Sequence, residues 1–175
     1  REALAKAGGG AAEKIRGIAC SGHGKGLYLW GKDNKPAYNG IVSTDGRAWK
    51  YPEQWQKDGT AEKAFEKTYQ RILASQPVSI LNWFKEHKPE VLENTQWIFE
   101  CKDYIRFRLT GEAFAEKTDY SGSGLMNLRD RCFDEELLAL FGLKDLMRCL
   151  PPLKNATAVC GAVCKETAER TGLRE

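Results

Sequence analysis

Three short polar segments of the sequence carry the residue types that could do chemistry. The first is Gly22-His23-Gly24-Lys25-Gly26, in which an imidazole and an ammonium group alternate with glycines. Glycine lets a ligand approach the backbone closely, and a lysine can donate a charge-assisted hydrogen bond to a hydroxyl or phosphate group. The same residues would also suit a tight hairpin with a solvated lysine, so the segment alone leaves both interpretations open.

Neither common nucleotide-binding motif fits this first segment. A P-loop needs Gly-x-x-x-x-Gly-Lys-Ser/Thr at the start of a helix, whereas Lys25 is followed by Gly26 and an apolar run typical of a strand. The dinucleotide pattern Gly-x-Gly-x-x-Gly also fails, because Gly22, Gly24 and Gly26 are evenly spaced. The spacing therefore argues against a nucleotide cradle in this loop.

The other two segments offer oxygen ligands and cations at predicted loop positions. Asp45 and Arg47 come directly after a predicted strand, and Asp119 and Tyr120 lie in residues 117–124, which are rich in small residues. A carboxylate can accept hydrogen bonds from two sugar hydroxyls, and an arginine can hold that carboxylate or a ligand oxygen. An ordinary turn closed by a surface ion pair fits the same residues, so neither segment is specific by itself.

The elements that must position these residues follow from hydrophobic periodicity and turn residues. Three short apolar runs in close succession predict an antiparallel meander, and the middle of the chain changes to helical spacing. Residues 1–14 read as the tail of a helix broken by three glycines. The further predictions are strands at 15–20, 26–30, 37–43 and 96–100, helices at 61–74, 77–87, 101–112 and 134–142, and a strand followed by a helix over 156–172.

Bulk composition narrows the class of protein. The 175 residues suit one domain, and 42% hydrophobic with 29% charged residues is typical of a soluble globular protein. The net charge of +3 is spread along the chain, which predicts neither nucleic-acid nor membrane partners, and the first residues lack a secretory signal. The six scattered cysteines form no Cys-x-x-Cys pair, which favours reduced thiols and a cytoplasmic location.

Four stretches of the chain together resemble a known family. "IACSGHGKGLYLWGKDNKPAYNGIVSTDGRA", "CKDYIRFRLTGE", "KTDYSGSGLMNL" and "LPPLKNATAVCGAV" are similar, in this order, to the amino-terminal domain of the FGGY family of carbohydrate kinases. The resemblance covers essentially the whole chain, and "GHGKGLYL" with "STDGRA" is most similar to the L-xylulose kinase branch. Xylulokinases more usually carry Gln-Met-His across positions 23 to 25 and glycerol kinases Gln-Arg-Glu, a departure that leaves the sugar open.

The resemblance implies a ribonuclease-H-like, actin-type α/β fold and an ATP- and Mg²⁺-dependent transfer of the γ-phosphoryl group to a sugar, here a ketopentose such as xylulose. Lys25 stands where the family places a substrate-contacting His or Glu, and His23 stands at a neighbouring Gln. Asp119 and Tyr120 match a segment that supplies a sugar contact in glycerol kinases. The substrate-binding residues implied by the resemblance are His23, Lys25, Asp45, Arg47, Asp119 and Tyr120.

Several parts of the family pattern are missing from residues 1–175. The amino-terminal Asp-x-Gly-Thr phosphate loop, the aspartate general base and the adenosine-binding domain do not occur in this sequence. The chain begins in mid-pattern and ends three residues after the last predicted helix, so we expect both ends to be cut. We therefore expect a partial sugar-side domain with no catalytic or metal-binding residue, which binds no cofactor and is inactive alone. The expected partners are a small-molecule sugar and a C-terminal kinase domain, and a homodimer stays open. The alternative is a non-catalytic sugar-binding or regulatory interaction module.

Overall fold

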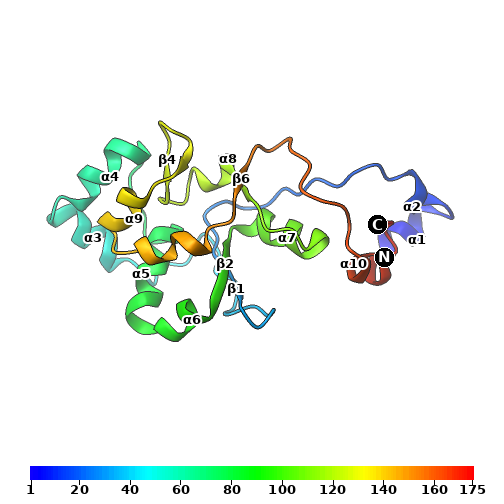
Figure 1. The fold of residues 1–175 in the computed structure, drawn as a ribbon, viewed down its shortest axis with the longest axis horizontal. Coiled ribbons are helices and arrows are strands. Elements are labelled where there is room, and N and C mark those ends of the chain that lie inside the picture. Colours follow the sequence, from blue (N-terminus) through cyan, green and yellow to red (C-terminus); the bar gives the residue numbers. More distant parts are fainter.

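Two apolar segments that are far apart in the sequence form the central strand pair. A computed structural model describes residues 1–175 and shows β1 (Tyr28–Gly31) antiparallel to β2 (Thr95–Phe99) near the middle of the molecule (Figure 1). Leu29 lies opposite Ile98 and both are buried, as expected for alternating apolar residues on a covered sheet. Strands were predicted at both places, and their pairing forms the scaffold to which the polar loops are attached.

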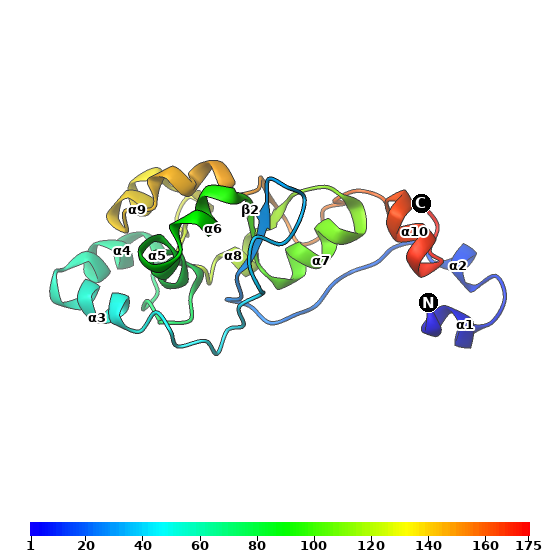
Figure 2. The same cartoon turned by 90° about the horizontal axis from the view of Figure 1, so that it is seen from below.

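Short helices surround this strand pair. Figures 1 and 2 show α3, α4, α5 and α9 gathered on one side of it and α7 on the other. The helices are α1 (Glu2–Ala7), α2 (Ala11–Lys14), α3 (Lys50–Lys57), α4 (Thr60–Thr68), α5 (Pro77–His87), α6 (Pro89–Asn94), α7 (Cys101–Thr110), α8 (Lys117–Tyr120), α9 (Glu135–Leu140), α10 (Lys165–Thr171) and the 3-10 helix η1 (Lys144–Cys149). No helix is both long and apolar enough to cross a bilayer.

Two further strand pairs have only two residues in each strand. β3 (Ala115–Glu116) runs parallel to β6 (Leu153–Lys154), and β4 (Met126–Asn127) runs antiparallel to β5 (Cys132–Phe133). The β3–β6 pair ties the segment before the third polar loop to a distant part of the chain. The fold is therefore mixed α/β, with small antiparallel and parallel sheets.

Local signals in the sequence set several helix ends correctly. Helix α5 begins at Pro77, where proline costs no hydrogen bond, and ends at His87. Helix α7 ends at Gly111 in the left-handed conformation, and the Asp134 side chain caps α9 by accepting a hydrogen bond from the Leu137 N–H at 2.9 Å. Helix α4 stops at Thr68, short of the predicted residue 74, because Tyr69 turns to a φ of 50°.

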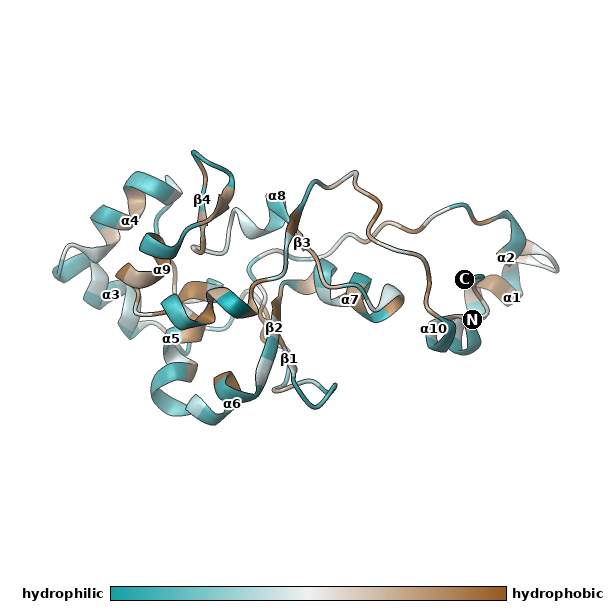
Figure 3. Cartoon of the chain, viewed as in Figure 1, coloured by the Kyte–Doolittle hydropathy of each residue, from teal (hydrophilic) through white to brown (hydrophobic).

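The predicted strands at 15–20 and at the start of 156–172 are wrong. Both segments are extended, but no backbone hydrogen bond joins residues 15–20 to another segment, and Ile18 and Val159 are 48% and 85% exposed. A strand needs a neighbour to pair its N–H and C=O groups, and the 175 residues supply none here. Figure 3 shows apolar patches along these two segments, which connect the main body to α1, α2 and α10.

The predicted meander is present in reduced form. After β1 the chain turns at Asn34, whose φ is 58°, and returns antiparallel through isolated bridges between Trp30 and Pro36 and between Leu27 and Ile41. No continuous strand forms at 37–43, because Gly40 and the turn at 42–45 interrupt the run. The buried core lies beneath this hairpin and α5, and includes Leu27, Ile41, Ile80, Leu81, Phe84 and Ile98.

Candidate functional site

The loop at residues 22–26 leads into β1 and has a constrained shape. Lys25 has a φ of 63°, a left-handed conformation that is uncommon outside glycine, and its N–H donates a hydrogen bond to Glu100 Oε2 at 3.2 Å. Gly26 is buried, and a Cβ atom at this position would come within 2.5 Å of the His23 ring. The loop therefore needs glycine beside the histidine, and its shape depends on a carboxylate at the end of β2.

His23 turns its ring toward the protein. Its Nε2 lies 3.0 Å from the Tyr28 hydroxyl, and the two ring centroids are 6.1 Å apart. Burial, together with Cys101, raises the pKa of Tyr28 to about 12, so the hydroxyl keeps its proton and can donate to the imidazole. His23 is half-buried and thus stabilises the loop through its contact with Tyr28.

Lys25 lies against the third polar loop. A Cβ atom on Gly122 would be 3.6 Å from Lys25 Cε, and one on Gly24 would be 3.2 Å from Asp119 Oδ1, so glycines allow the two loops to approach. Asp119 is 8% exposed and pairs with Lys102 Nζ at 3.3 Å. An ammonium group and a carboxylate from segments almost a hundred residues apart therefore lie at one junction, where they could bind a ligand with hydroxyl groups.

The loop that carries Asp119 is firmly anchored. The Glu116 carboxylate accepts hydrogen bonds from the N–H groups of Thr118 at 2.7 Å and Asp119 at 3.0 Å, which caps α8. Tyr120 is 1% exposed, and its hydroxyl donates to the Ile98 carbonyl in β2. Tyr120 is therefore a core side chain that fixes the loop, and its hydroxyl is already engaged.

The turn at Asp45 and Arg47 is closed on itself. Asp45 Oδ1 accepts hydrogen bonds from Arg47 N and Nε at 3.0 and 2.9 Å, and Oδ2 accepts from Nη2 at 2.8 Å. These hydrogen bonds hold the pKa of Asp45 below its usual range, against the opposing effect of burial. The guanidinium lies 4.8 Å from the Trp83 ring centroid, and no hydrogen bond or ion pair links this turn to Lys25.

Of the six residues implied by the resemblance, the structure brings four to adjoining loops: His23, Lys25, Asp119 and Tyr120. Asp45 and Arg47 instead form a separate, self-contained pair beside α5.

Glu100 and Lys102 are the residues at this junction that sequence reasoning missed. Glu100 is 1% exposed, and burial, followed by the charge of Asp119, raises its pKa to about 9. Residues 96–112 have the pattern of a buried strand followed by an amphipathic helix, so the carboxyl group of Glu100, at the end of the apolar run, is easily overlooked. The available signal was an acidic residue directly after Ile98 and Phe99, at the end of a strand with no polar alternation.

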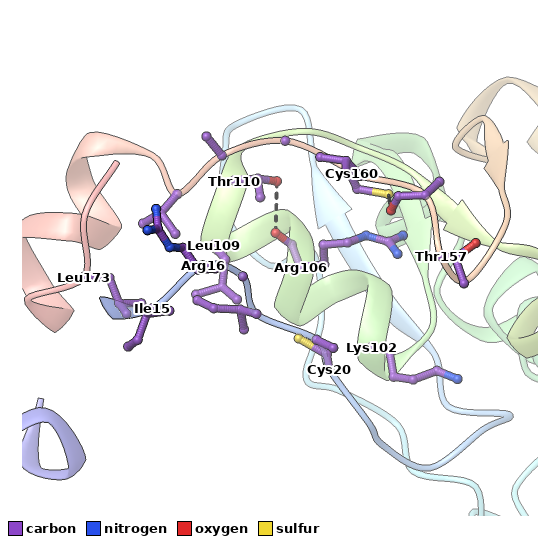
Figure 4. A pocket seen from close by; sticks show the side chains of 18 of the residues that line it. Ile15, Arg16, Cys20, Lys102, Arg106, Leu109, Thr110, Thr157, Cys160 and Leu173 are labelled. Carbon is purple, nitrogen blue, oxygen red and sulfur yellow. Dashed lines mark hydrogen bonds between the residues drawn. The ribbon is translucent and has the colours of Figure 1, made fainter. Parts of the chain in front are cut away.

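A large groove adjoins the junction beside α7. The cavity has a volume of about 850 Å³ and lies between residues 15–20, α7 and residues 156–163, with Lys102 and Arg106 on its wall (Figure 4). Thr110 donates its hydroxyl hydrogen bond back to the Arg106 carbonyl at 3.0 Å within α7. The groove thus lies along the two extended segments that have no strand partner.

Comparison with known proteins identifies the family and the fold of the chain. The profile of the N-terminal domain of the FGGY family of carbohydrate kinases matches residues 1–175. The chain is 41% identical over 161 residues, 92% of its length, to a probable L-xylulose kinase of Pasteurella multocida and 37% identical over 172 residues, 98% of its length, to the L-xylulose/3-keto-L-gulonate kinase of Escherichia coli. The crystal structure of a ligand-bound xylulose kinase from Lactobacillus acidophilus aligns over 93% of the chain with a TM-score of 0.82 and 29% identity.

These comparisons also define what the chain represents. It covers 33% of the Pasteurella protein, 34% of the Escherichia protein and 34% of the Lactobacillus structure, so it spans about a third of the length of its relatives. The structural agreement confirms the actin-type α/β fold that the resemblance implies. The match of the family profile to every residue means that the chain belongs to the FGGY family of carbohydrate kinases.

Proposed function

We propose that this chain forms the sugar-side part of an ATP-dependent carbohydrate kinase whose acceptor is a ketopentose such as xylulose. Membership of the FGGY family supports the reaction class, and the L-xylulose kinases among the relatives support a pentulose. Because the chain spans about a third of those relatives, the complete activity belongs to the longer protein rather than to these residues alone.

The contact between the two loops carries the proposal. Lys25 lies over Gly122 while Asp119 lies beside Gly24, so a cation with three donors and a carboxylate acceptor share one junction. A ketopentose presents several hydroxyl groups and a carbonyl group, which need donors and acceptors at close range. Lys25 would donate to a sugar oxygen, while Asp119 and its partner Lys102 would orient the sugar hydroxyl groups on the opposite side.

ATP and Mg²⁺ belong to the proposal only at the level of the whole enzyme. Phosphoryl transfer needs a phosphate cradle, metal ligands and a base placed together. No group of three or more His, Cys, Asp or Glu side chains in residues 1–175 is arranged to hold a metal ion. We propose that a C-terminal kinase domain supplies these groups, and we assign no step of phosphoryl transfer to residues 1–175.

Sugar binding by the Lys25→Ala variant tests the proposal. A charge-assisted hydrogen bond contributes about 1.5–3 kcal/mol, so we expect titration calorimetry with L-xylulose to show affinity roughly 10- to 100-fold weaker than for the unaltered chain. Lys35→Ala is the matched control, because Lys35 is an exposed lysine in the turn after β1. Affinity that is equal in the unaltered chain and in both variants would contradict the role of Lys25.

An activity assay separates the kinase from a non-catalytic sugar-binding or regulatory module. We expect ATP- and xylulose-dependent ADP release when residues 1–175 are expressed with the rest of their reading frame, and none from residues 1–175 alone. Sugar binding without phosphorylation by the longer protein would favour the module instead.

A further inference from the structure

A cluster of buried carboxyl groups lies directly behind the junction of the two loops. Only three buried side-chain nitrogen or oxygen atoms in the chain lack a hydrogen-bond partner, and two of them are Glu100 Oε1 and Asp119 Oδ2. Glu100 is 1% exposed and Asp119 is 8% exposed. A buried carboxylate oxygen without a partner is costly, so two such atoms on neighbouring side chains require an explanation.

One proton satisfies both atoms. If Glu100 carries a proton, its hydroxyl group can donate to the Asp119 carboxylate, so that neither oxygen is left without a partner. Two neighbouring carboxyl groups shielded from water cannot both ionise at low cost, as in pairs that share a proton. The elevated pKa of Glu100, about 9, arises from burial and then from the Asp119 charge and hydrogen bond, and agrees with this arrangement.

The same pair contacts the loop that carries Lys25. Glu100 Oε2 accepts the Lys25 N–H at 3.2 Å, the only hydrogen bond that the backbone N–H groups of residues 22–26 donate to a side chain. Lys25 holds a left-handed φ of 63°, which costs roughly 1–2 kcal/mol and persists only when its surroundings impose it. Asp119 Oδ1 lies against Gly24 from the other side.

We propose that Glu100 and Asp119 form a carboxyl pair bridged by one proton, and that this pair is the positioning device that holds Lys25 at the sugar site. Ionising Glu100 strengthens Oε2 as an acceptor for the Lys25 N–H, but it also places a second negative charge beside Asp119; the repulsion moves the two carboxylates apart and shifts Lys25 with Glu100. Glu100 is a positioning residue, since it acts on the sugar through Lys25. The inference rests on the proposed function, because Lys25 needs a fixed position only if it contacts the sugar.

Other charged groups around the pair influence how readily Glu100 ionises. Asp103 and Glu116 add negative charge, while Lys102 pairs with Asp119 at 3.3 Å and Arg106 pairs with Asp103 at 2.6 Å. The Tyr120 hydroxyl, held on Ile98, stays neutral because burial raises its pKa well above the usual value. Lys25, Asp103, Asp119 and Tyr120 act on Glu100 directly. Lys102 acts on it through Asp119, and Arg106 and Glu116 act on it through Asp103.

Carbon-13 NMR of the chain labelled at glutamate carboxyl carbons tests the shared proton without any sugar. We expect one glutamate to remain protonated at pH 7 and to titrate only above about pH 8, far from the ordinary value near 4.3. This signal should vanish in Glu100→Gln and persist in the matched control Glu112→Gln, an exposed glutamate after α7. In Asp119→Asn the midpoint should fall by at least one pH unit. A spectrum in which every glutamate titrates below pH 6 would overturn the pair.

The pH dependence of L-xylulose binding tests the positioning role. The glutamine of Glu100→Gln can accept from the Lys25 N–H and donate to Asp119 but has no proton to lose, so sugar binding by this variant should depend little on pH. The unaltered chain should lose about tenfold in affinity between pH 7 and pH 9.5, and Glu100→Gln should lose less than threefold. The same decline in both proteins would overturn the role of Glu100.

The two experiments separate this inference from the proposed function. Sugar binding with a Glu100 that is ionised at pH 7 overturns the inference alone. A protonated Glu100 with no L-xylulose binding at any pH overturns the positioning role together with the proposed sugar site, while the NMR titration still establishes the shared proton. If Glu100→Gln does not fold, the shift of the midpoint in Asp119→Asn decides the question.

Discussion

Lys25 has an unfavourable backbone conformation, and its ammonium group is the proposed donor to a sugar oxygen. Its φ of 63° is one of four positive values among non-glycine residues, and the other three lie in turns or at the end of a helix. Strain of this kind is retained where the surroundings impose a geometry, and here Glu100 and Asp119 lie on either side of the loop. The left-handed conformation of Lys25 therefore costs some stability and fixes the position of its ammonium group.

The Lys25→Gly variant separates stability from binding. Glycine adopts the left-handed conformation without penalty, although it loses more chain entropy on folding, so the free energy of unfolding should rise by roughly 0.5–1 kcal/mol. Sugar affinity should nevertheless fall as far as in Lys25→Ala. Urea denaturation and calorimetry measure the two effects, and a variant that is less stable than the unaltered chain would contradict the strain at this position.

At the scale of elements, Asp134 connects three parts of the fold. Its carboxylate caps α9 through the Leu137 N–H, accepts a hydrogen bond from Asn127 in β4 at 2.9 Å and pairs with Lys67 in α4 at 2.7 Å. Although burial alone would raise it, these hydrogen bonds and the Lys67 charge lower the pKa of Asp134 to about 2. The ionised form is thus bound more tightly in the folded state.

The Asp134→Ala variant should lose about 1–2 kcal/mol of stability at neutral pH, the usual effect of removing a helix cap with its ion pair. A lowered carboxyl pKa stabilises the fold above the unfolded value, near 3.8, and this contribution is lost as the pH falls toward 2. The difference in unfolding free energy should therefore shrink between about pH 4 and pH 2. Glu136→Ala, which removes an exposed partner of Lys67, should cost less than about 0.5 kcal/mol at any pH.

Sequence reasoning predicted the elements whose ends are encoded locally and missed those that depend on distant partners. Pro77, Gly111 and Asp134 each fix a helix end through their own backbone or side chain, and all three predictions are confirmed. Helices α3 and α6 were missed, because α3 carries a proline in its first turn and α6 follows α5 after a single residue. The sequence could not show whether residues 15–20 pair with another strand, because an apolar run does not reveal which segment lies beside it.

The candidate site shows the same division between local and distant information. The polar loops stand out as unusual residue types between apolar runs, which is why His23, Lys25 and Asp119 were singled out; their role in sugar binding stays a prediction. The partner of the Lys25 backbone could not, because Glu100 is 75 positions away and sits at the end of an apolar strand. Asp45 and Arg47 were also predicted to bind the sugar; in the structure they hydrogen-bond to each other, and their role in binding stays a prediction.

The whole molecule divides into a packed body and a loosely packed end. Leu27, Ile98 and α5 form the buried core, whereas residues 15–20 and 156–163 border the groove beside α7 with exposed aliphatic side chains. The backbone of residues 15–20 has the extended shape of a strand and no partner. Stability must therefore come from the body, and the groove contributes little to it.

Two isoleucine substitutions test this division. Ile98→Ala removes a side chain that is 1% exposed and should cost about 2–5 kcal/mol, as large-to-small changes in a core do. Ile18→Lys alters a side chain that is 48% exposed and should change the free energy of unfolding by less than about 0.5 kcal/mol. Thermal or urea unfolding compares them, and an equal loss in both would mean that residues 15–20 are packed.

The anchoring of Tyr120 to the Ile98 carbonyl and the capping of α8 by Glu116 make one wall of the junction stiff. The facing wall, residues 22–26, has no backbone ladder; it is supported by the Glu100 carboxyl oxygen that accepts the Lys25 N–H and by the Tyr28 hydroxyl beside His23. Under the proposed function, substitutions at His23 and Lys25 could change the preferred acceptor while the stiff wall keeps its position, so that the sugar changes without a change of fold.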